Sequence, residues 1–146
     1  MTAAGGLIET LRGRVAVGEC DHLGRMNVEA YGARVADATV MLAHAIGVTA
    51  EYIARQRRTL VTLHQDIVHV GELEAGDLLV MHGGVLSIDG ELIRLLHRIV
   101  RVEDRAAVLT AKVLVRGMDL ERRTFVALEE RMLARARRLR VCEAEL

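Results

Sequence analysis

The sequence predicts an α+β fold, in which one antiparallel sheet curls around a single long helix. Three observations lead to this prediction. Residues 28–46 place apolar side chains at the spacing of an α-helix, and Gly47 follows as a helix-ending residue. Much of the chain after residue 58 is strand-like, with β-branched residues and alternating apolar and polar positions. Within that part, Asp89-Gly90 is a strong signal for a hairpin turn. A single helix among several strands is expected to be wrapped by their sheet.

Composition narrows the class of protein. A length of 146 residues favours one domain over the whole chain, 1–146, and 51% hydrophobic beside 27% charged residues excludes an unfolded chain. Basic and acidic residues number 20 each, so the formal net charge is zero and offers no field for a phosphate backbone. We therefore expect no nucleic-acid partner. With only 2% aromatic residues, the chain also lacks a platform on which bases could stack.

The cysteines and the N-terminal residues indicate the compartment. Cys20 and Cys142 fit no metal or redox motif, and we expect reduced thiols, with a disulfide as the alternative. The histidines match no metal-binding spacing, so no metal site is expected. The first residues lack the basic and apolar regions of a signal peptide, and no uncharged apolar run is long enough to cross a membrane. The expectation is a cytoplasmic protein without a membrane partner.

The first half of the chain predicts a strand, a turn and two helices. Alternation over residues 13–20 predicts the first strand, and a turn-like stretch over 21–26 follows, in which Gly24 can take a positive φ. Asn27 is a good N-cap for the helix over 28–46. Small residues widen the apolar face of this helix, which predicts that other elements pack closely around it. Thr49 caps a shorter helix over 50–57.

The second half predicts four strands in antiparallel succession, over residues 59–70, 78–86, 92–102 and 107–115. Residues 129–141 form a basic, amphipathic segment that predicts a terminal helix. A sheet of this kind leaves an open edge. Pairing two such edges across a two-fold axis would bury them, so we expect a homo-oligomer of at least two chains.

The segment from Asp21 to Tyr31 carries a resemblance to a known family. It reads Asp21-x-x-Gly24-Arg25-Met26-Asn27-x-x-x-Tyr31, between the predicted strand and the long helix. This pattern resembles the active-site segment of the hotdog-fold acyl-CoA thioesterases, the 4-hydroxybenzoyl-CoA thioesterase-like group, whose members often read Asp-x-x-Gly-His-x-Asn there. The resemblance continues through Gly76-Asp77 and residues 95–98 and 118–123, and covers roughly residues 15 to 130. Within the group, the chain looks closest to the branch that includes betainyl-CoA thioesterases.

The resemblance implies a hotdog fold and hydrolysis of a small or medium acyl-CoA to a free acid and CoA. In it, Asp21 is the nucleophile or base, the backbone N–H of Val28 is the oxyanion donor, and Asn27 orients substrate or water. Gly24, Arg25 and Tyr31 would contact the substrate. The site would lie between the subunits of a homodimer or homotetramer, and coenzyme A enters only as part of the substrate, with no separate cofactor. The scarcity of aromatic residues favours an aliphatic or polar acyl group over an aryl one.

Two positions depart from the family pattern. Arg25 stands where the family has histidine, and it could pair with Asp21 and lower the pKa of that carboxyl group. His64 stands where many relatives have a carboxylate. It is either a general base supplied across the dimer or a strand histidine with one backbone partner. By residue type alone, Asp21 is also a turn aspartate, and Cys20 beside it is a weaker candidate nucleophile.

Arginines are the candidate ligands for the phosphates of CoA. Those expected near the pocket mouth are Arg57, Arg58, Arg122 and Arg123, although such runs also occur on solvated faces. The alternative function is a non-catalytic acyl-CoA-binding or regulatory protein on the same fold, which the changes at positions 25 and 64 motivate. A dehydratase or hydratase on this fold is a third hypothesis. Relatives with that activity typically use a histidine together with an acid on the long helix. Ala30, Ala33 and Ala36 offer no such acid, and Glu29 and Asp37 are the acids that remain on the helix.

Overall fold

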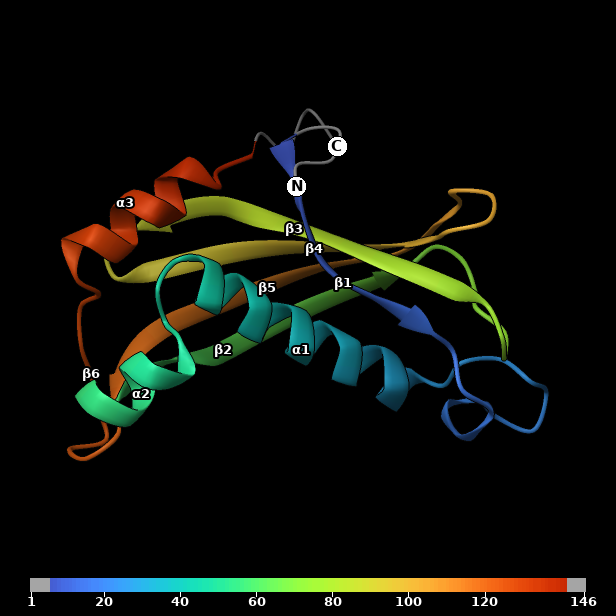
Figure 1. Ribbon diagram of the computed structural model, residues 1–146, viewed down its shortest axis with the longest axis horizontal. Coiled ribbons are helices and arrows are strands. Elements are labelled where there is room, and N and C mark those ends of the chain that lie inside the picture. The colour runs from blue at the N-terminus through green and yellow to red at the C-terminus, as the bar shows by residue number, and fades with distance from the viewer. Residues whose placement is uncertain (1–5, 142–146) are drawn as a thin grey trace.

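The computed structural model describes residues 6–141, and its strands form one antiparallel sheet. The sheet order is β1-β3-β4-β5-β2, with a short β6 beside β5. The strands are β1 (Ile8–Arg14), β2 (Arg58–His69), β3 (Leu78–Asp89), β4 (Leu92–Arg101), β5 (Ala107–Asp119) and β6 (Thr124–Phe125). The helices are α1 (Val28–Ala45), α2 (Ala50–Gln56) and α3 (Glu130–Arg138), with a 3-10 turn, η2, at Val17–Glu19. Figure 1 shows the sheet curling around α1, which confirms the predicted α+β arrangement.

Helix α1 forms because its sequence supplies a cap, an apolar stripe and a stop. The side chain of Asn27 accepts the N–H of Ala30 at 2.8 Å, and Gly47 follows the helix with a φ of 108°. The stripe turns toward the sheet and is buried at Ala30, Tyr31, Val35, Ala38, Leu42 and Ala43. Because Val35 and Ala38 are fully buried and small, the sheet packs directly against the helix.

The first strand lies earlier than the sequence pattern predicts. β1 ends at Arg14, so the expected strand over 13–20 holds only the end of β1 and then η2. Glu19 explains the difference, because its carboxylate accepts the N–H of Ala16 at 2.9 Å and a guanidinium N–H of Arg34 at 3.0 Å. These bonds hold the chain in a turn. Val15 is buried but Val17 is 81% exposed, so the two alternating valines do not share one buried face.

The strand succession is correct for β3, β4 and β5 and wrong for β2. The Asp89-Gly90 hairpin is confirmed, with Gly90 at a φ of 61°. A simple succession would place β2 beside β3, but β2 pairs with β5 along its whole length, from Arg58 opposite Asp119 to His69 opposite Leu109. Between β2 and β3 the chain must therefore cross from one edge of the sheet to the strand next to the opposite edge.

That crossing passes the N-terminal end of α1. We call residues 70–77 the crossing segment. Within it, the carbonyl of Leu73 accepts the N–H of Met26 at 2.8 Å, and the N–H of Ala75 donates to the carbonyl of Gly24 at 3.2 Å. Leu73 is fully buried. The crossing segment is therefore bonded to the loop that precedes α1, and the two together form one end of the molecule.

The two outermost strands of the sheet are β1 and β2. β2 exposes much of its length, including Leu63 and Val68. At the other end of the molecule from the crossing segment, α3 buries Met132 and Ala136 in the core. In the part of the chain that the structure describes, no helix has the length and apolarity needed to cross a membrane.

Candidate functional site

A cleft of about 590 Å³ opens at the N-terminal end of α1. Three stretches of chain form it: the loop before α1 with the first turn of that helix, the end of β2, and the start of the crossing segment. Its lining residues are Asp21, Arg25, Met26, Asn27, Val28, Tyr31, His69, Val70, Gly71 and Glu72. The structure thus brings together five of the residues that the sequence singled out, namely Asp21, Arg25, Asn27, Val28 and Tyr31.

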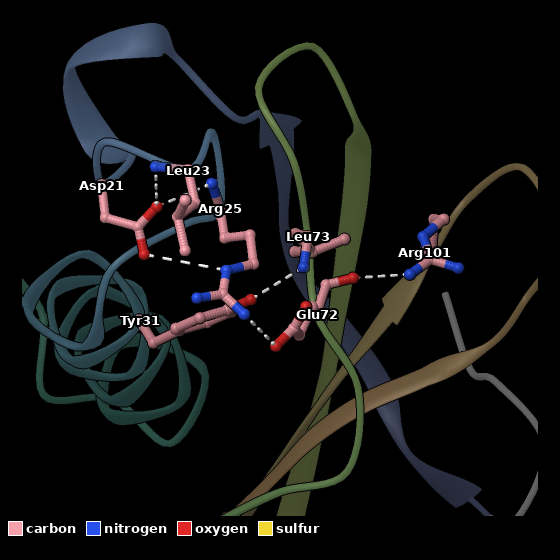
Figure 2. Close-up of polar contacts among 7 residues, drawn as sticks. All are labelled: Asp21, Leu23, Arg25, Tyr31, Glu72, Leu73 and Arg101. Carbon is pink, nitrogen blue, oxygen red and sulfur yellow. Dashed lines mark hydrogen bonds and ion pairs between the residues drawn. The ribbon is translucent and has the colours of Figure 1, made fainter.

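The two carboxylate oxygens of Asp21 have different roles: one accepts hydrogen bonds within the turn, and the other lies on the side of the cleft. Its Oδ1 accepts the N–H of Leu23 at 2.9 Å and the N–H of Arg25 at 3.1 Å (Figure 2). Its Oδ2 lies 3.8 Å from Nε of Arg25. The N–H of Arg25 is the largest cause of a lowered pKa for Asp21, with the N–H of Leu23 and the Arg25 charge adding to it. Asp21 is therefore a turn residue that also presents an ionised oxygen.

Gly24 makes this turn possible. Its φ of 80° lies in the left-handed region, as the sequence predicts. Its N–H donates to the carbonyl of Asp21 at 3.0 Å, and its own carbonyl accepts from the crossing segment. Gly24 does not line the cleft, so its part is to shape the loop rather than to contact a ligand.

Arg25 links the two carboxylates of the cleft. Its guanidinium lies between Asp21 and Glu72, with Nη1 at 3.2 Å from Oε1 of Glu72 (Figure 2). The expected ion pair with Asp21 is present at 3.8 Å. The side chain of Arg25 is 41% exposed, so a molecule in the cleft would meet it. Two acids and one arginine give this part of the cleft a negative balance.

The first turn of α1 supplies hydrogen-bond donors. The first N–H groups of a helix have no acceptor within it, and the helix dipole makes that end positive. Asn27 takes one of these groups, the N–H of Ala30. In the described part of the chain no acceptor bonds the N–H of Val28, which lines the cleft. This amide can therefore bond an oxygen that develops negative charge.

Tyr31, His69 and Glu72 complete the wall. The hydroxyl of the buried Tyr31 accepts the N–H of Leu73 at 2.9 Å, so it holds the crossing segment in place. The imidazole of His69 packs edge-on against the Tyr31 ring, with centroids 5.1 Å apart. His69 and Glu72 were not predicted as site residues. No sequence motif around His69 or Glu72 indicates a site, because these residues come close to α1 only through the pairing of β2 with β5.

His64 lies in a different place. In β2, Gln65 and Ile67 stand opposite the buried Val113 and Ala111, so they share the side of the sheet that faces α1. His64 alternates with them and lies on the opposite side, in a small hollow that it shares with Asp66, Arg94, Lys112 and Leu114. Within one chain, therefore, His64 does not reach the cleft, and its catalytic role stays a prediction that depends on a partner subunit.

The four arginines expected to bind CoA gather at the far end of β2. Arg58 begins that strand and lies 3.9 Å from Asp119, and the N–H of Arg122 donates to Asp119 at 2.9 Å. Arg57 and Arg123 flank them, each with a positive φ. β2 spans 12 residues, or about 40 Å at the rise of a strand, so one chain cannot bring these arginines to its own cleft.

The remaining candidates receive little support. The pKa of the Cys20 thiol is raised by burial and by the nearby Asp21 charge, which keeps it protonated and a poor nucleophile. Cys142 lies outside the described residues. Asp37, the acid that a dehydratase would use on α1, lines a groove with Leu11 and Met41 rather than the cleft. Glu29 is exposed and does not line the cleft either.

Comparison with known families agrees with this geometry. The family model described as the thioesterase-like superfamily matches residues 15–136, a range that contains the entire cleft. The chain belongs to the thioesterase-like superfamily. No curated protein sequence matches this thioesterase-like protein.

Solved structures show the same fold at low sequence identity. Hypothetical protein SAV2348 of Staphylococcus aureus, solved in complex with CoA, superposes with a TM-score of 0.82 at 20% identity, over 88% of this chain and 80% of that one. Slr0204 of Synechocystis, a 1,4-dihydroxy-2-naphthoyl-CoA thioesterase, superposes with a TM-score of 0.74 at 13% identity, over 86% of this chain and 93% of that one. YbaW of Escherichia coli, a probable thioesterase, superposes with a TM-score of 0.73 at 15% identity, over 88% of this chain and 96% of that one. The predicted hotdog fold is thus confirmed for the thioesterase-like protein.

Proposed function

We propose that this thioesterase-like protein hydrolyses a small or medium acyl-CoA, with an aliphatic or polar acyl group, to the free acid and CoA. One observation carries the proposal. The open oxygen of Asp21 and the N–H of Val28 at the start of α1 belong to the same cleft. A base or nucleophile beside an oxyanion donor is the minimum that thioester hydrolysis needs.

The reaction can proceed in two ways from these groups. Asp21 either removes a proton from a water that attacks the thioester carbon, or attacks that carbon itself and leaves an anhydride for water to open. In both, a C–O bond forms, the C–S bond breaks, and a proton passes to the departing thiolate. The N–H of Val28 would stabilise the oxyanion, and the lowered pKa of Asp21 keeps its carboxylate ionised at neutral pH.

The charge of the cleft bears on the acyl group. Asp21 and Glu72 are two carboxylates against the single guanidinium of Arg25. Such a balance disfavours an acyl group with its own carboxylate and favours a neutral polar or cationic one. This supports the betainyl-CoA-like branch as the proposed subgroup, because a betainyl group carries a quaternary ammonium. The hypothesis ranks substrates and can be tested directly.

We also propose a homodimer, formed by pairing the open edges of two β2 strands across a two-fold axis. Antiparallel pairing would place the start of the partner's β2 beside the end of this one. The partner's Arg57 and the arginines around it would then lie near His69 and the cleft. This arrangement supports their proposed role as ligands of the CoA phosphates, which a single chain does not allow. It would also cover the exposed Val68.

A thiol-release assay on a panel of acyl-CoAs tests the function. The panel should contain straight-chain neutral acyl groups, a trimethylammonium acyl group and a dicarboxylic half-thioester. We expect release with the first two and at least about tenfold lower kcat/KM with the third, because its carboxylate meets Asp21 and Glu72. No release with any substrate, together with measurable CoA binding, would replace the proposal with the alternative of a non-catalytic acyl-CoA-binding protein.

Subunit complementation tests the shared site. One chain carries Asp21→Ala, and the other carries glutamine at Arg57, Arg58, Arg122 and Arg123. Each alone is expected to lose at least about tenfold in kcat/KM. After co-refolding in equal amounts, half of the dimers are mixed and hold one intact site each, so about a quarter of the wild-type activity should return. If each site is built from one chain, no mixed dimer has an intact site and no activity returns.

A further inference from the structure

A second hollow, of about 470 Å³, lies on the face of the sheet that points away from α1. Strand register places it. Arg12 of β1 is opposite Val80 of β3, which is opposite Val100 of β4, and in the next row His82 is opposite Arg98. The intervening residues, Leu79 and Met81, belong to the core around α1. Because successive side chains of a strand point to opposite faces, these rows point outward.

The floor of the hollow is aliphatic. It is formed by Leu7, Val80, Val100 and Val102, and among the described residues no Phe, Tyr or Trp side chain lines the hollow. Leu7 and Val80 are buried, whereas Val100 is half-buried and Val102 is 36% exposed, so a ligand would cover mainly Val100 and Val102. Burying such a floor under another apolar group is favourable by the hydrophobic effect.

Four arginines surround that floor, and they differ in whether another side chain neutralises them. Arg12 pairs with Glu9 at 2.6 Å, and Arg101 pairs with Asp104 at 2.8 Å. Among the described residues, the guanidinium groups of Arg98 and Arg105 have no hydrogen bond or ion pair. The hollow therefore holds two uncompensated guanidinium groups, although the chain as a whole is neutral.

The positive charge of the hollow also acts on His82, which lines it. Burial lowers the pKa of His82, the positive charges of Arg98 and Arg12 lower it further, and Glu9 opposes them. The turn after β4 contributes as well. Oδ1 of Asp104 accepts the N–H of Ala106 at 3.1 Å, and Arg105 between them has a φ of 58°.

We propose that this hollow is a binding site for a medium-chain carboxylate, with the alkyl chain on the aliphatic floor and the carboxylate between Arg98 and Arg105. The planar guanidinium fork matches a carboxylate, with two parallel N–H···O bonds. A nucleotide phosphate would also meet the charge. However, the four floor side chains are all aliphatic and the one ring beside them is the imidazole of His82, so an alkyl chain fits the floor better than a nucleobase does.

The hollow is separate from the cleft but joined to it through one side chain. Arg101 lines the hollow, and its Nη2 donates to the carbonyl of Glu72 at 2.5 Å (Figure 2). Glu72 lines the cleft and pairs with Arg25 there. A ligand in the hollow would therefore lie beside a side chain that is bonded to the crossing segment. The binding itself does not depend on the proposed thioester hydrolysis.

Calorimetric titration of the full chain with decanoate tests the site. We expect saturable binding, and a dissociation constant raised at least about tenfold by the double substitution Arg98→Gln with Arg105→Gln. The matched control replaces Arg55, an exposed arginine of α2 that is paired with Glu51, by glutamine and should bind as wild type does. The single Arg105→Gln, on an exposed turn, keeps the test valid if the double variant unfolds.

Other outcomes would overturn the site. Decanoate that binds the double variant as tightly as wild type would place the ligand elsewhere, for example in the cleft. Decanol that binds as tightly as decanoate would remove the role of the arginines. Absence of binding up to about 1 mM decanoate would contradict the proposal outright. None of these results depends on hydrolysis, so failure here and failure of the proposed function are distinguishable.

Discussion

Asp21→Asn is expected to lower kcat/KM for thioester hydrolysis by about 10²- to 10⁴-fold without unfolding the protein. The amide oxygen of asparagine can still accept the N–H groups of Leu23 and Arg25, which Oδ1 of Asp21 accepts now. The turn is therefore kept. What is lost is the negative charge on Oδ2, the atom that would act on water or on the thioester carbon.

Thiol release and thermal unfolding, measured on the same preparations, separate the two roles of Asp21. Asp21→Ala should lose both the turn bonds and the activity, whereas Asp21→Asn should lose only the activity. Asp89→Asn is the matched control, since it makes the same chemical change at an exposed residue that ends β3 and does not line the cleft. Activity of Asp21→Asn within about twofold of wild type would leave Asp21 as a turn residue only.

The part of the site that the sequence predicts is the part that is local. Asp21, Gly24, Asn27, Val28 and Tyr31 fall within one turn, one cap and the first turn of one helix. Each of these structures is set by neighbouring residues. The spacing of these residues in the sequence is therefore enough to predict how they lie relative to one another. Asn27 is at once the cap that starts α1 and a wall of the cleft, so predicting the helix also predicts the place of the site.

The rest of the site depends on contacts between distant parts of the chain. His69 and Glu72 reach α1 only because β2 pairs with β5 and the chain then crosses back to β3. No spacing in the sequence specifies which strand pairs with which, since β2 could meet either neighbour with the same alternation. The first strand was misplaced for a related reason. Alternation continues past Arg14, while Glu19 and Arg34 close the turn through bonds that the pattern does not display.

The buried His97 is expected to make stability depend on pH. His97 lies on β4, is fully buried and meets Thr39 of α1, with Nε2 to Oγ1 at 2.9 Å. Since the hydroxyl of Thr39 donates to the carbonyl of Val35 at 2.9 Å, we assign the imidazole proton to Nε2, which then donates to Thr39. Nδ1 has no partner in the described structure. A second proton there would have no acceptor, and burial lowers the pKa of His97 to about 4.

The sign of the effect follows from the two states. An unfolded His97 has the ordinary pKa of 6.5, so it takes up a proton as the pH falls below that value, while the folded protein does not until about 4. Stability contributed by the neutral histidine is therefore complete above pH 6.5. It is lost progressively between 6.5 and 4, and is constant below. At 1.36 kcal/mol for each unit of pKa, the loss is roughly 3 kcal/mol.

Urea unfolding of wild type and His97→Leu between pH 7 and pH 4.5 measures this. The leucine variant should show a smaller fall in unfolding free energy, by about 2–3 kcal/mol over that range, because it has no proton to bind at this position. Thr39 keeps its bond to Val35 in the variant, so no hydroxyl is stranded in the core. Carboxyl groups with lowered pKa values, such as Glu19 and Asp21, contribute equally to both proteins and cancel in the difference. His44→Gln, an exposed position on α1, should behave as wild type does. Parallel curves for wild type and His97→Leu would show that the buried imidazole is not what links folding to protons.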